Sequence, residues 1–248
     1  MSSLGRFMFA LSVAAPVGAT NVAAQTTGTT ATSPPTVVEL FTSQGCSSCP
    51  ASDRQLGELA KRPDVLPLSL HVDYWDYMGW KDPFASSANT ERQRGYARNL
   101  KQRYVYTPEM VFGGVAHDPG SDPAKVGKML RIAAERVGTK VSPTLTRTAG
   151  DGVAVVMPET RVSTPCDIWL VTFDRQHHTS VARGENKGAT LTNYNVVRSF
   201  EKLGTWNGEA TTWKVSADRV SLGRSIAVVV QGVSYGPIVG AARLDRGN

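Results

Sequence analysis

Residues 37–50 read VVELFTSQGCSSCP, a stretch in which an apolar run leads to two closely spaced cysteines. A run rich in β-branched and aromatic residues leads to a turn that carries Cys46 and Cys49, and a segment with apolar residues on one helical face follows. The pattern predicts a strand, a tight turn with a Cys-x-x-Cys pair, and a helix over about residues 50–61. Unpaired amides and the positive end of the dipole at a helix N-terminus favour a thiolate over a thiol. Cys46 is therefore the candidate nucleophile, and Cys49 is the candidate resolving thiol.

The first 24 residues form a candidate signal peptide. Arg6 gives a positively charged start, residues 7–19 are apolar, and Val22-Ala23-Ala24 offers a small-residue cleavage site. An uncleaved membrane anchor is the alternative, but the apolar run is short for a bilayer. We expect a periplasmic or secreted protein with no membrane span after cleavage, and a flexible leader over residues 25–35.

The charge balance of the chain is mildly basic. Its 248 residues include 27 Lys and Arg and 21 Asp and Glu. Removal of residues 1–24 takes away Arg6 and no acidic residue, which leaves 26 basic against 21 acidic side chains, or +5. The excess is spread along the sequence, whereas nucleic-acid binding needs a clustered patch or a motif with stacking aromatics. We expect no nucleic-acid partner, and the length is sufficient for two domains.

The chain holds three cysteines, too few for a disulfide-dense scaffold. A bond between Cys46 and Cys49 would close a very short loop, which constrains the unfolded chain little and stabilises little. The pair is therefore interpreted as chemically reactive and not as a structural cross-link. Cys166 precedes an apolar strand and is interpreted as a buried thiol, with a third redox partner as the alternative.

A second strand is expected over residues 65–72, which makes a βαβ unit with parallel strands. The following segment, residues 73–84, contains five aromatic residues and three aspartates. It leaves the same end of the sheet as the cysteines, where ligands bind in open parallel sheets. Tyr74, Trp75 and Trp80 are candidate substrate-binding residues; the alternative is that these aromatic residues only pack the loop against the body.

Residues 105–114, VYTPEMVFGG, predict a strand that is entered through Thr107-Pro108 and turns into a hairpin at Gly-Gly. An ordered X-Pro bond at such a place is a candidate for the cis isomer. Polar-faced helices are expected on either side, over residues 87–103 and from Ser121 as N-cap to residue 136.

From residue 138 onward the helical period disappears. Short strands separated by turn residues predict an all-β sandwich, with strands over residues 141–148, 152–157, 167–173, 196–203, 210–215, 226–231 and 238–244. His117, His177 and His178 lack a third ligand at metal spacing, so we expect neither a metal nor a cofactor. The loop 184–188 is a simple turn or touches the thiol domain or a partner.

The order of elements, the Cys-x-x-Cys turn and the later Thr-Pro resemble the thioredoxin superfamily, in which that proline is cis and faces the cysteines. The segments at residues 39–50, 71–76 and 105–108 resemble more closely a family of secreted bacterial thioredoxin-like proteins that is catalogued only as a domain of unknown function. The similarity continues through RGENKG at residues 183–188 and NVVR at residues 195–198.

The resemblance implies a fold and a redox site, but no substrate. We expect an α/β thioredoxin-like domain over residues 36–137, followed by the β-sandwich domain over residues 138–248, with Pro108 opposite the cysteines. Two departures from thioredoxin are visible. Gly45 stands where thioredoxin has a tryptophan, and Ser47-Ser48 replaces its Gly-Pro, the dipeptide that tunes the redox potential.

Glu39 lies seven residues before Cys46, whereas thioredoxin carries a buried acid six residues before its first cysteine. With one inserted residue, Glu39 would be its counterpart. A desolvated carboxyl there would have a raised pKa and could exchange a proton with Cys49. The alternative is a glutamate at the edge of the sheet with its head in water.

Three functions remain open from the sequence. The first is a thiol–disulfide oxidoreductase that acts on protein thiols or disulfides in the cell envelope through Cys46 and Cys49, with Thr107-Pro108 offering its backbone to an extended substrate. The second is a non-catalytic protein that binds a partner or ligand on a thioredoxin scaffold. The third is copper handling through the two cysteines and a histidine, because soft thiolates select Cu(I).

Overall fold

The computed structural model describes Met1 and residues 33–138, 140–220 and 223–245. The expected signal peptide after Met1, and the expected leader up to residue 32, lie outside the described residues. Everything below concerns the unit of residues 33–248. Its elements are β1 (Thr36–Thr42), α1 (Pro50–Leu59), β2 (Val65–His71), a short 3-10 helix (Asp76–Met78), α2 (Ser87–Asn99), β3 (Glu109–Phe112), β4 (Ala116–Asp118), α3 (Pro123–Arg136), β5 (Thr144–Arg147), β6 (Val153–Met157), β7 (Cys166–Ser180), β8 (Thr190–Trp206), β9 (Thr211–Val215), a second 3-10 helix (Ala217–Arg219), β10 (Ser225–Gly232) and β11 (Ile238–Leu244).

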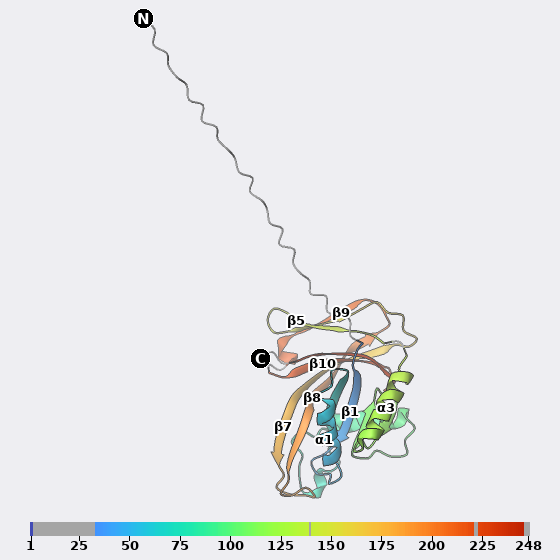
Figure 1. Ribbon diagram of the computed structural model, residues 1–248, viewed down its shortest axis with the longest axis vertical. Coiled ribbons are helices and arrows are strands. Elements are labelled where there is room, and N and C mark those ends of the chain that lie inside the picture. Colours follow the sequence, from blue (N-terminus) through green and yellow to red (C-terminus); the bar gives the residue numbers. More distant parts are fainter. Residues whose placement is uncertain (2–32, 139, 221–222, 246–248) are drawn as a thin grey trace. The chain divides into compact units, whose positions relative to one another are not determined.

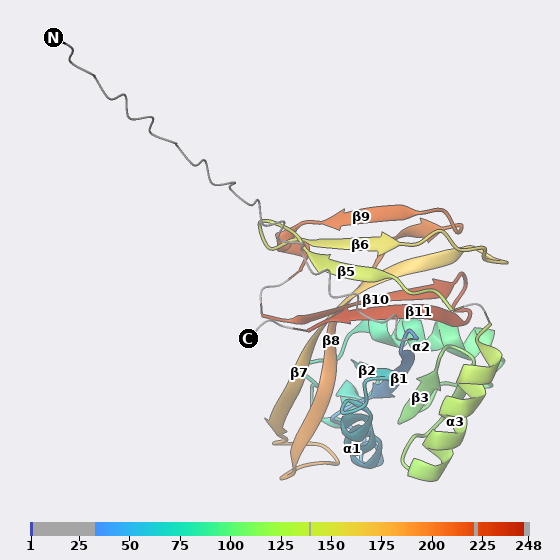
Figure 2. The ribbon, with the colours of Figure 1, turned by 45° about the horizontal axis from the view of Figure 1, so that its top comes forward.

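In the described part of the chain the strands form two sheets (Figure 1). The larger sheet has eight strands in the order β11-β10-β7-β8-β2-β1-β3-β4, and the smaller has three in the order β5-β6-β9. β1 and β2 are parallel, as the predicted βαβ unit requires, whereas β3 runs antiparallel to β1. Figure 2 shows β5, β6 and β9 as a layer that faces β10 and β11.

The predicted fold, an α/β thioredoxin-like domain followed by a separate all-β sandwich, is wrong. The large sheet runs through both halves of the sequence, because β2 pairs in parallel with β8 at Ser69 and Val196. One cluster of the buried core spans both halves as well: Phe41 and Leu68 from the first half pack in it with Val171 and Val229 from the second. The chain is mostly β, with one mixed sheet at its centre.

A local contact explains how β8 joins β2. Pro67 lies in the middle of β2 and has no amide hydrogen to give to a neighbouring strand. The side chain of Asn195 on β8 donates to the Pro67 carbonyl at 2.8 Å. Asn195 itself has a positive φ of 47°, a conformation that asparagine tolerates better than most residues. The junction between the two halves is therefore made by one side chain as much as by the backbone.

Helices cover both faces of the sheet around β1. Alternate residues of a strand point to opposite faces, and Val38 and Leu40 pack with Leu56 of α1 and Leu130 of α3. Phe41 packs on the opposite face with Tyr96 of α2. The sheet therefore has an α1/α3 face and an α2 face.

β7 and β8 are much longer than the sequence predicted. Their apolar parts end near Phe173 and Val196, but the pairing continues through polar residues to Ser180 and Thr190. Backbone hydrogen bonds between two strands do not need apolar side chains, so the hydrophobic pattern missed this extension. The polar part forms a two-stranded ribbon alongside α1 (Figure 1).

Two smaller predictions concern helix and hairpin ends. Residues 109–118 form the expected hairpin, with Gly113 and Gly114 at positive φ in its turn. The N-cap of α3 is Asp122 and not Ser121, because Pro123 fills the first helical position and the residue before it becomes the cap. The Asp122 carboxylate accepts hydrogen bonds from the next two free amides, which belong to Ala124 and Lys125.

Candidate functional site

Cys46 and Cys49 form a disulfide in the turn between β1 and α1. Cys49 is the N-cap of the helix, and its carbonyl accepts from the amides of Ser52 and Asp53. The hydroxyl of Ser48 lies 3.3 Å from the sulfur of Cys46. The pair therefore occupies the helix N-terminus, where the sequence placed it.

Neither cysteine has exposed surface, although Ser47 and Ser48 between them are exposed. The loop between β7 and β8 reaches the backbone on both sides of Cys46. The side-chain amide of Asn186 donates at 2.9 Å to the carbonyls of Gln44 and Cys46, and Glu185 accepts from the amide of Ser47 at 3.2 Å. Of the two interpretations of loop 184–188, contact with the thiol segment is confirmed.

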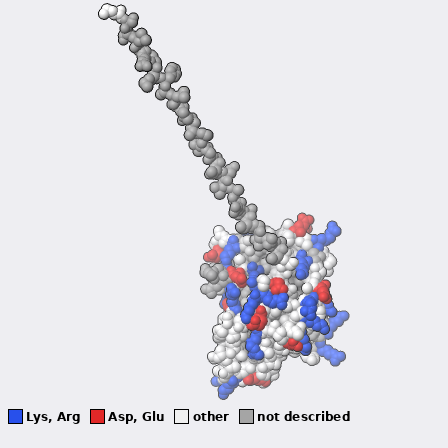
Figure 3. Space-filling model, viewed as in Figure 1, with Lys and Arg blue, Asp and Glu red and all other residues white. Residues whose placement is uncertain are grey.

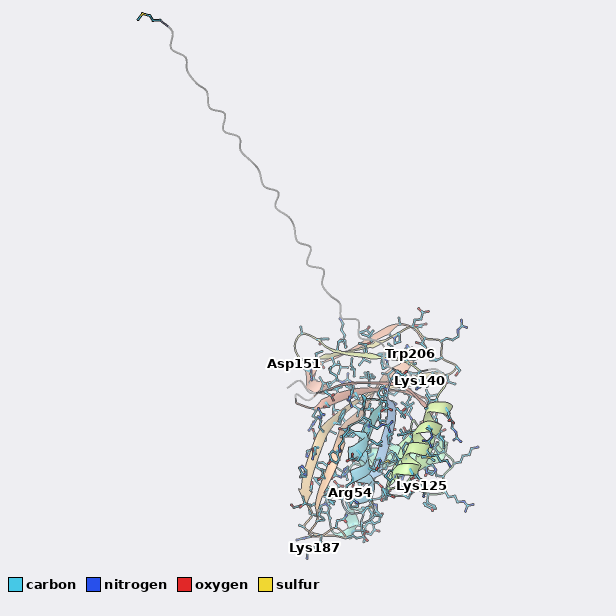
Figure 4. The ribbon with its side chains drawn as sticks, viewed as in Figure 1. Arg54, Lys125, Lys140, Asp151, Lys187 and Trp206 are labelled. Atoms are coloured by element: carbon cyan, nitrogen blue, oxygen red, sulfur yellow. A yellow bond between two sulfur atoms is a disulfide. The ribbon has the colours of Figure 1, made fainter. Side chains whose placement is uncertain are left out.

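Figure 4 labels Lys187 at the tip of this loop and Arg54 on α1. Residues 181–189, which we call the cover loop, connect the polar ends of β7 and β8. Gly184 of the cover loop lies so close to Trp80 that a side chain at position 184 would approach the Trp80 Cβ to 3.2 Å. The cover loop and the aromatic segment after β2 thus meet over the disulfide turn.

The aromatic segment surrounds the turn from the other side. Trp75 donates its indole hydrogen to the Thr107 hydroxyl at 2.7 Å, and Trp80 donates to the side-chain carbonyl of Gln44 at 3.1 Å. A Cβ at Gly45 would lie 3.3 Å from the Trp75 Cβ, which explains why glycine precedes Cys46. Trp75, Trp80 and Thr107 are therefore brought together beside the cysteines.

Pro108 and Tyr74 are the two other predicted residues near this segment. The Thr107–Pro108 peptide bond is cis, as expected, and the hydroxyl of Thr107 accepts the hydrogen bond from Trp75. Tyr74 instead donates to the side-chain carbonyl of Gln93 on α2, and burial raises the pKa of Tyr74 to about 12. Tyr74 supports the loop from the α2 side.

Glu39 is not brought together with the cysteines. It lies on β1 between Val38 and Leu40, which face α1, so its own side chain points to the α2 face. There Arg92 donates to both carboxylate oxygens, at 2.5 and 3.1 Å, and the Tyr96 hydroxyl donates to one of them. The alternative of a carboxyl in water does not fit either, because Glu39 is completely buried. Its geometry is that of a structural ion pair.

A different set of titratable groups lies buried behind the disulfide. The Nδ1 of His71 on β2 forms a hydrogen bond of 2.6 Å with the carboxylate of Asp82. The same carboxylate accepts a hydrogen bond from the backbone amide of Gln44 at 2.8 Å. Burial raises the pKa of Asp82, but the charge and hydrogen bond of His71 and the backbone amides outweigh burial, and the pKa is lowered. The disulfide turn is thus tied to His71 through Asp82.

Asp53 completes this set from α1. Burial raises the pKa of Asp53 from 3.8 to about 6, while the charge of His71 acts against that rise. Hydrogen bonding from the side chains of Thr42 on β1 and Asn193 on β8 also acts against the rise. Asp53 was not among the predicted site residues, although its spacing of three from the inward-facing Leu56 places it on the buried side of the helix.

A groove of about 520 Å³ lies on the α2 face, away from the disulfide. Phe84, Trp169, Phe200 and Tyr235 line it, and the Arg92 guanidinium lies 3.8 Å from the centroid of the Phe200 ring. Arg92 is itself committed to Glu39. The groove therefore combines aromatic side chains with polar and charged ones, among them Glu91 and Arg198.

Three further observations bear on the expected partners. Within residues 33–138, 140–220 and 223–245, no helix is long and apolar enough to cross a membrane. The same residues contain no group of three or more His, Cys, Asp or Glu side chains arranged to hold a metal ion. On the face shown in Figure 3, basic and acidic side chains are interspersed.

Comparison with known proteins gives a family and two similar structures. A family model described as "Protein of unknown function (DUF1223)" matches residues 37–231. The chain is similar to the crystal structure of protein AGR_C_4864 from Agrobacterium tumefaciens, with 34% identity, a TM-score of 0.75, and coverage of 88% of this chain and 96% of the other. It is also similar in fold to HBP35 of Porphyromonas gingivalis, with 13% identity, a TM-score of 0.58, and coverage of 86% and 76%. No curated protein matches.

Proposed function

The chain belongs to the DUF1223 family of proteins of unknown function, and we propose from its site that it is a thiol–disulfide oxidoreductase. One observation carries the proposal: the Cys46–Cys49 disulfide lies at the N-terminus of α1, beside Trp75 and Thr107. A disulfide across so short a loop adds little stability, and a helix N-terminus favours the thiolate of a reduced pair. Both conditions favour a disulfide that undergoes thiol–disulfide exchange over one that only cross-links the chain.

The chemistry uses the two cysteines in sequence. In the reduced protein, the Cys46 thiolate attacks one sulfur of a substrate disulfide, which forms a mixed disulfide and releases the first substrate thiolate. Cys49 then attacks the Cys46 sulfur, re-forms the internal disulfide, and releases the second thiolate. Two electrons pass from the cysteine pair to the substrate, and the reverse sequence oxidises a substrate dithiol.

Access is part of this proposal, because both sulfurs are buried. We propose that the cover loop moves away from Gln44 and Cys46 before a substrate reaches the disulfide. The hydrogen bonds that must break are few, the two of Asn186 and the one that Glu185 accepts, and Gly184 must also separate from Trp80. A hydrogen bond of this kind contributes about 0.5–1.5 kcal/mol net, so displacement is within thermal reach.

The setting proposed for this activity is the periplasm or the exterior of the cell, with protein thiols or disulfides of the envelope as substrates. The N-terminal apolar stretch of the sequence supports export. Disulfides persist in such compartments, which suits the oxidised pair. In this proposal the disulfide turn and Thr107-Pro108 work as the site of a thioredoxin-like protein does, on a sheet of different extent.

The test separates the two cysteines. Reduced Cys49→Ala protein, treated with glutathione disulfide, should hold one glutathione on Cys46 in its intact mass and release it to dithiothreitol. The matched Cys46→Ala protein should form an adduct at least tenfold more slowly, and Cys166→Ala should leave the wild-type behaviour unchanged. Equal adduct rates in the Cys46→Ala and Cys49→Ala proteins, or none in either, would contradict the proposal.

The groove on the α2 face favours a second candidate function, the binding of a small aromatic ligand without catalysis. Phe200 and Trp169 would provide its stacking surface. A Phe200→Ala variant should then lose the thermal stabilisation that such a ligand gives, while a Cys46→Ser variant should keep it. Loss of ligand stabilisation in both variants would mean that binding depends on the disulfide and not on the groove alone.

A further inference from the structure

The groove on the α2 face is formed by α2, β7 and β8, together with the segment before α2 and the turn after β10. Its volume of about 520 Å³ lies within the range of about 300–1,000 Å³ that is usual for small-molecule sites. Its aromatic side chains hold flat apolar ligands, while a few polar groups at defined places decide which ligand is preferred. The polar groups of the groove therefore indicate the class of its ligand.

Arg92 is a buried cation that lines this groove, with an exposed fraction of 5%. Its Nε and Nη2 donate to the carboxylate of Glu39, and Nη2 also donates to Tyr96 and Gln231. The remaining nitrogen, Nη1, donates to no group among the described residues, although it is not sealed from solvent. Arg92 therefore has donor capacity left for a hydrogen-bond acceptor in the groove.

The aromatic side chains of the groove also surround this guanidinium. Its central carbon lies 3.8 Å from the centroid of the Phe200 ring, 5.4 Å from that of Trp169 and 5.9 Å from that of Tyr235. Guanidinium groups stack on aromatic faces and are held in a fixed orientation there. A ligand group that accepts from Nη1 therefore lies beside aromatic surface that can pack against the rest of the ligand.

The charged side chains that line the groove are Glu91, Arg92 and Arg198. Glu91 accepts from Arg94 at 2.6 Å, so its charge is already paired. Arg198 has only a long contact of 3.7 Å between its Nε and the carboxylate of Asp174. The charge that the groove offers a ligand is thus mainly positive. An anionic acceptor suits it better than a neutral one, because hydrogen bonds to ionised groups are shorter and stronger.

We propose that the groove binds a small aromatic carboxylate. Its carboxylate accepts from Nη1 of Arg92 and is attracted by the charge of Arg198, and its ring packs against Phe200 and Trp169. This inference rests on the second candidate function, ligand binding in the groove, and names the ligand class. It does not depend on thiol–disulfide exchange at Cys46.

The test compares three probes of one shape and different charge: 2-naphthoate, the neutral 2-naphthamide and the cationic 2-naphthylmethylamine. Each is titrated into oxidised full-length protein at pH 7 in a calorimeter. Naphthoate should bind about tenfold more tightly than naphthamide, because one hydrogen bond becomes charge-assisted, and the amine should bind most weakly.

Variants assign the charge to the groove. Arg198→Gln should weaken naphthoate binding about threefold and change naphthamide binding less than about twofold. Arg62→Gln is the matched control, because it removes the same charge from an exposed pair with Asp64 outside the groove. It should change neither affinity. Arg92 itself is left intact, since its replacement strands the buried charge of Glu39.

Phe200→Ala places the ligand. It should weaken both naphthoate and naphthamide about tenfold, because both ligands pack against that ring. Equal affinities of naphthoate and naphthamide for wild type, with both reduced in Phe200→Ala, would overturn the carboxylate assignment and leave the second candidate function standing. Naphthoate binding that Phe200→Ala does not change, or no binding of any probe, would overturn the inference together with that candidate function.

Discussion

Arg92 holds both carboxylate oxygens of Glu39 on the face of the sheet opposite α1. Neither partner is exposed by more than 5%, and the guanidinium also donates to Gln231 and lies against Phe200. The ion pair thus connects β1, α2 and β10, which come from both halves of the chain. It is one of the contacts that join the two predicted domains into one compact unit.

Removal of Arg92 should therefore be severely destabilising. Arg92→Met leaves the Glu39 charge buried without its partner, and breaking a buried pair in this way typically costs about 3–5 kcal/mol. The measurement is the free energy of unfolding in urea. Arg94→Met is the matched control on the same helix, since Arg94 forms an exposed pair with Glu91 and such pairs contribute little. Similar losses in the two variants would contradict the structural role of the Glu39 pair.

Glu39→Gln should leave the redox chemistry intact. The side chain of Glu39 points away from α1, so its protonation is not expected to affect Cys49. We predict that the rate of the second exchange step, and its dependence on pH between 5 and 9, will match wild type within threefold while the unfolding free energy falls. A displaced pH profile in Glu39→Gln would restore the role that the sequence analysis gave this residue.

The oxidised protein should reveal the burial of Asp53 through the pH dependence of its stability. The pKa of Asp53 is raised from 3.8 to about 6 in the folded protein, so the native state binds more protons than the unfolded state between these values. Its contribution is thus present at low pH and is lost as the pH rises from about 4 to 6. The gap between the two pKa values corresponds to ~3 kcal/mol at most.

Asp53→Asn removes this dependence. Oxidised Asp53→Asn should be more stable than oxidised wild type at pH 7.5, and the two proteins should be about equally stable at pH 4. Urea unfolding at the two pH values measures the difference. Equal stability of wild type and variant at both values would mean that the Asp53 carboxyl is not desolvated.

Asn186 should control the access of thiols to the disulfide. Asn186→Ala removes two hydrogen bonds between the cover loop and the turn, which together contribute roughly 1–3 kcal/mol. If the loop must open, reduction by dithiothreitol should become about tenfold faster or more. Lys187→Ala is the matched control in the same loop, because Lys187 is exposed. Identical reduction rates in wild type and Asn186→Ala would show that the loop does not limit access.

The sequence predicted the local structure well. The strand, turn and helix around Cys46 appear where the hydrophobic periodicity placed them, and each of the seven strands expected after residue 138 is found among the described residues, as β5 to β11. These features depend on neighbours in the sequence, such as the alternation in β6 and the apolar run of β10. Local patterning therefore carried this part of the prediction.

Long-range pairing was not predictable in the same way. Nothing in the periodicity of β2 or β8 states that Ser69 pairs with Val196, or that Asn195 reaches Pro67. For this reason one sheet was expected to be two domains. The same limit affected the site: spacing from Cys46 favoured Glu39, although strand alternation directs that carboxyl to the other face.

The most direct test of the account is the reduction potential of the Cys46–Cys49 pair. Full-length protein is equilibrated at pH 7 with glutathione and dithiothreitol buffers of defined ratio, and the reduced fraction is read by mass after the free thiols are alkylated. We predict reversible cycling of the folded protein with a potential between about −270 and −120 mV, the range of dithiol enzymes. A potential below about −300 mV, or reduction only when the protein unfolds, would show a structural disulfide and contradict the account.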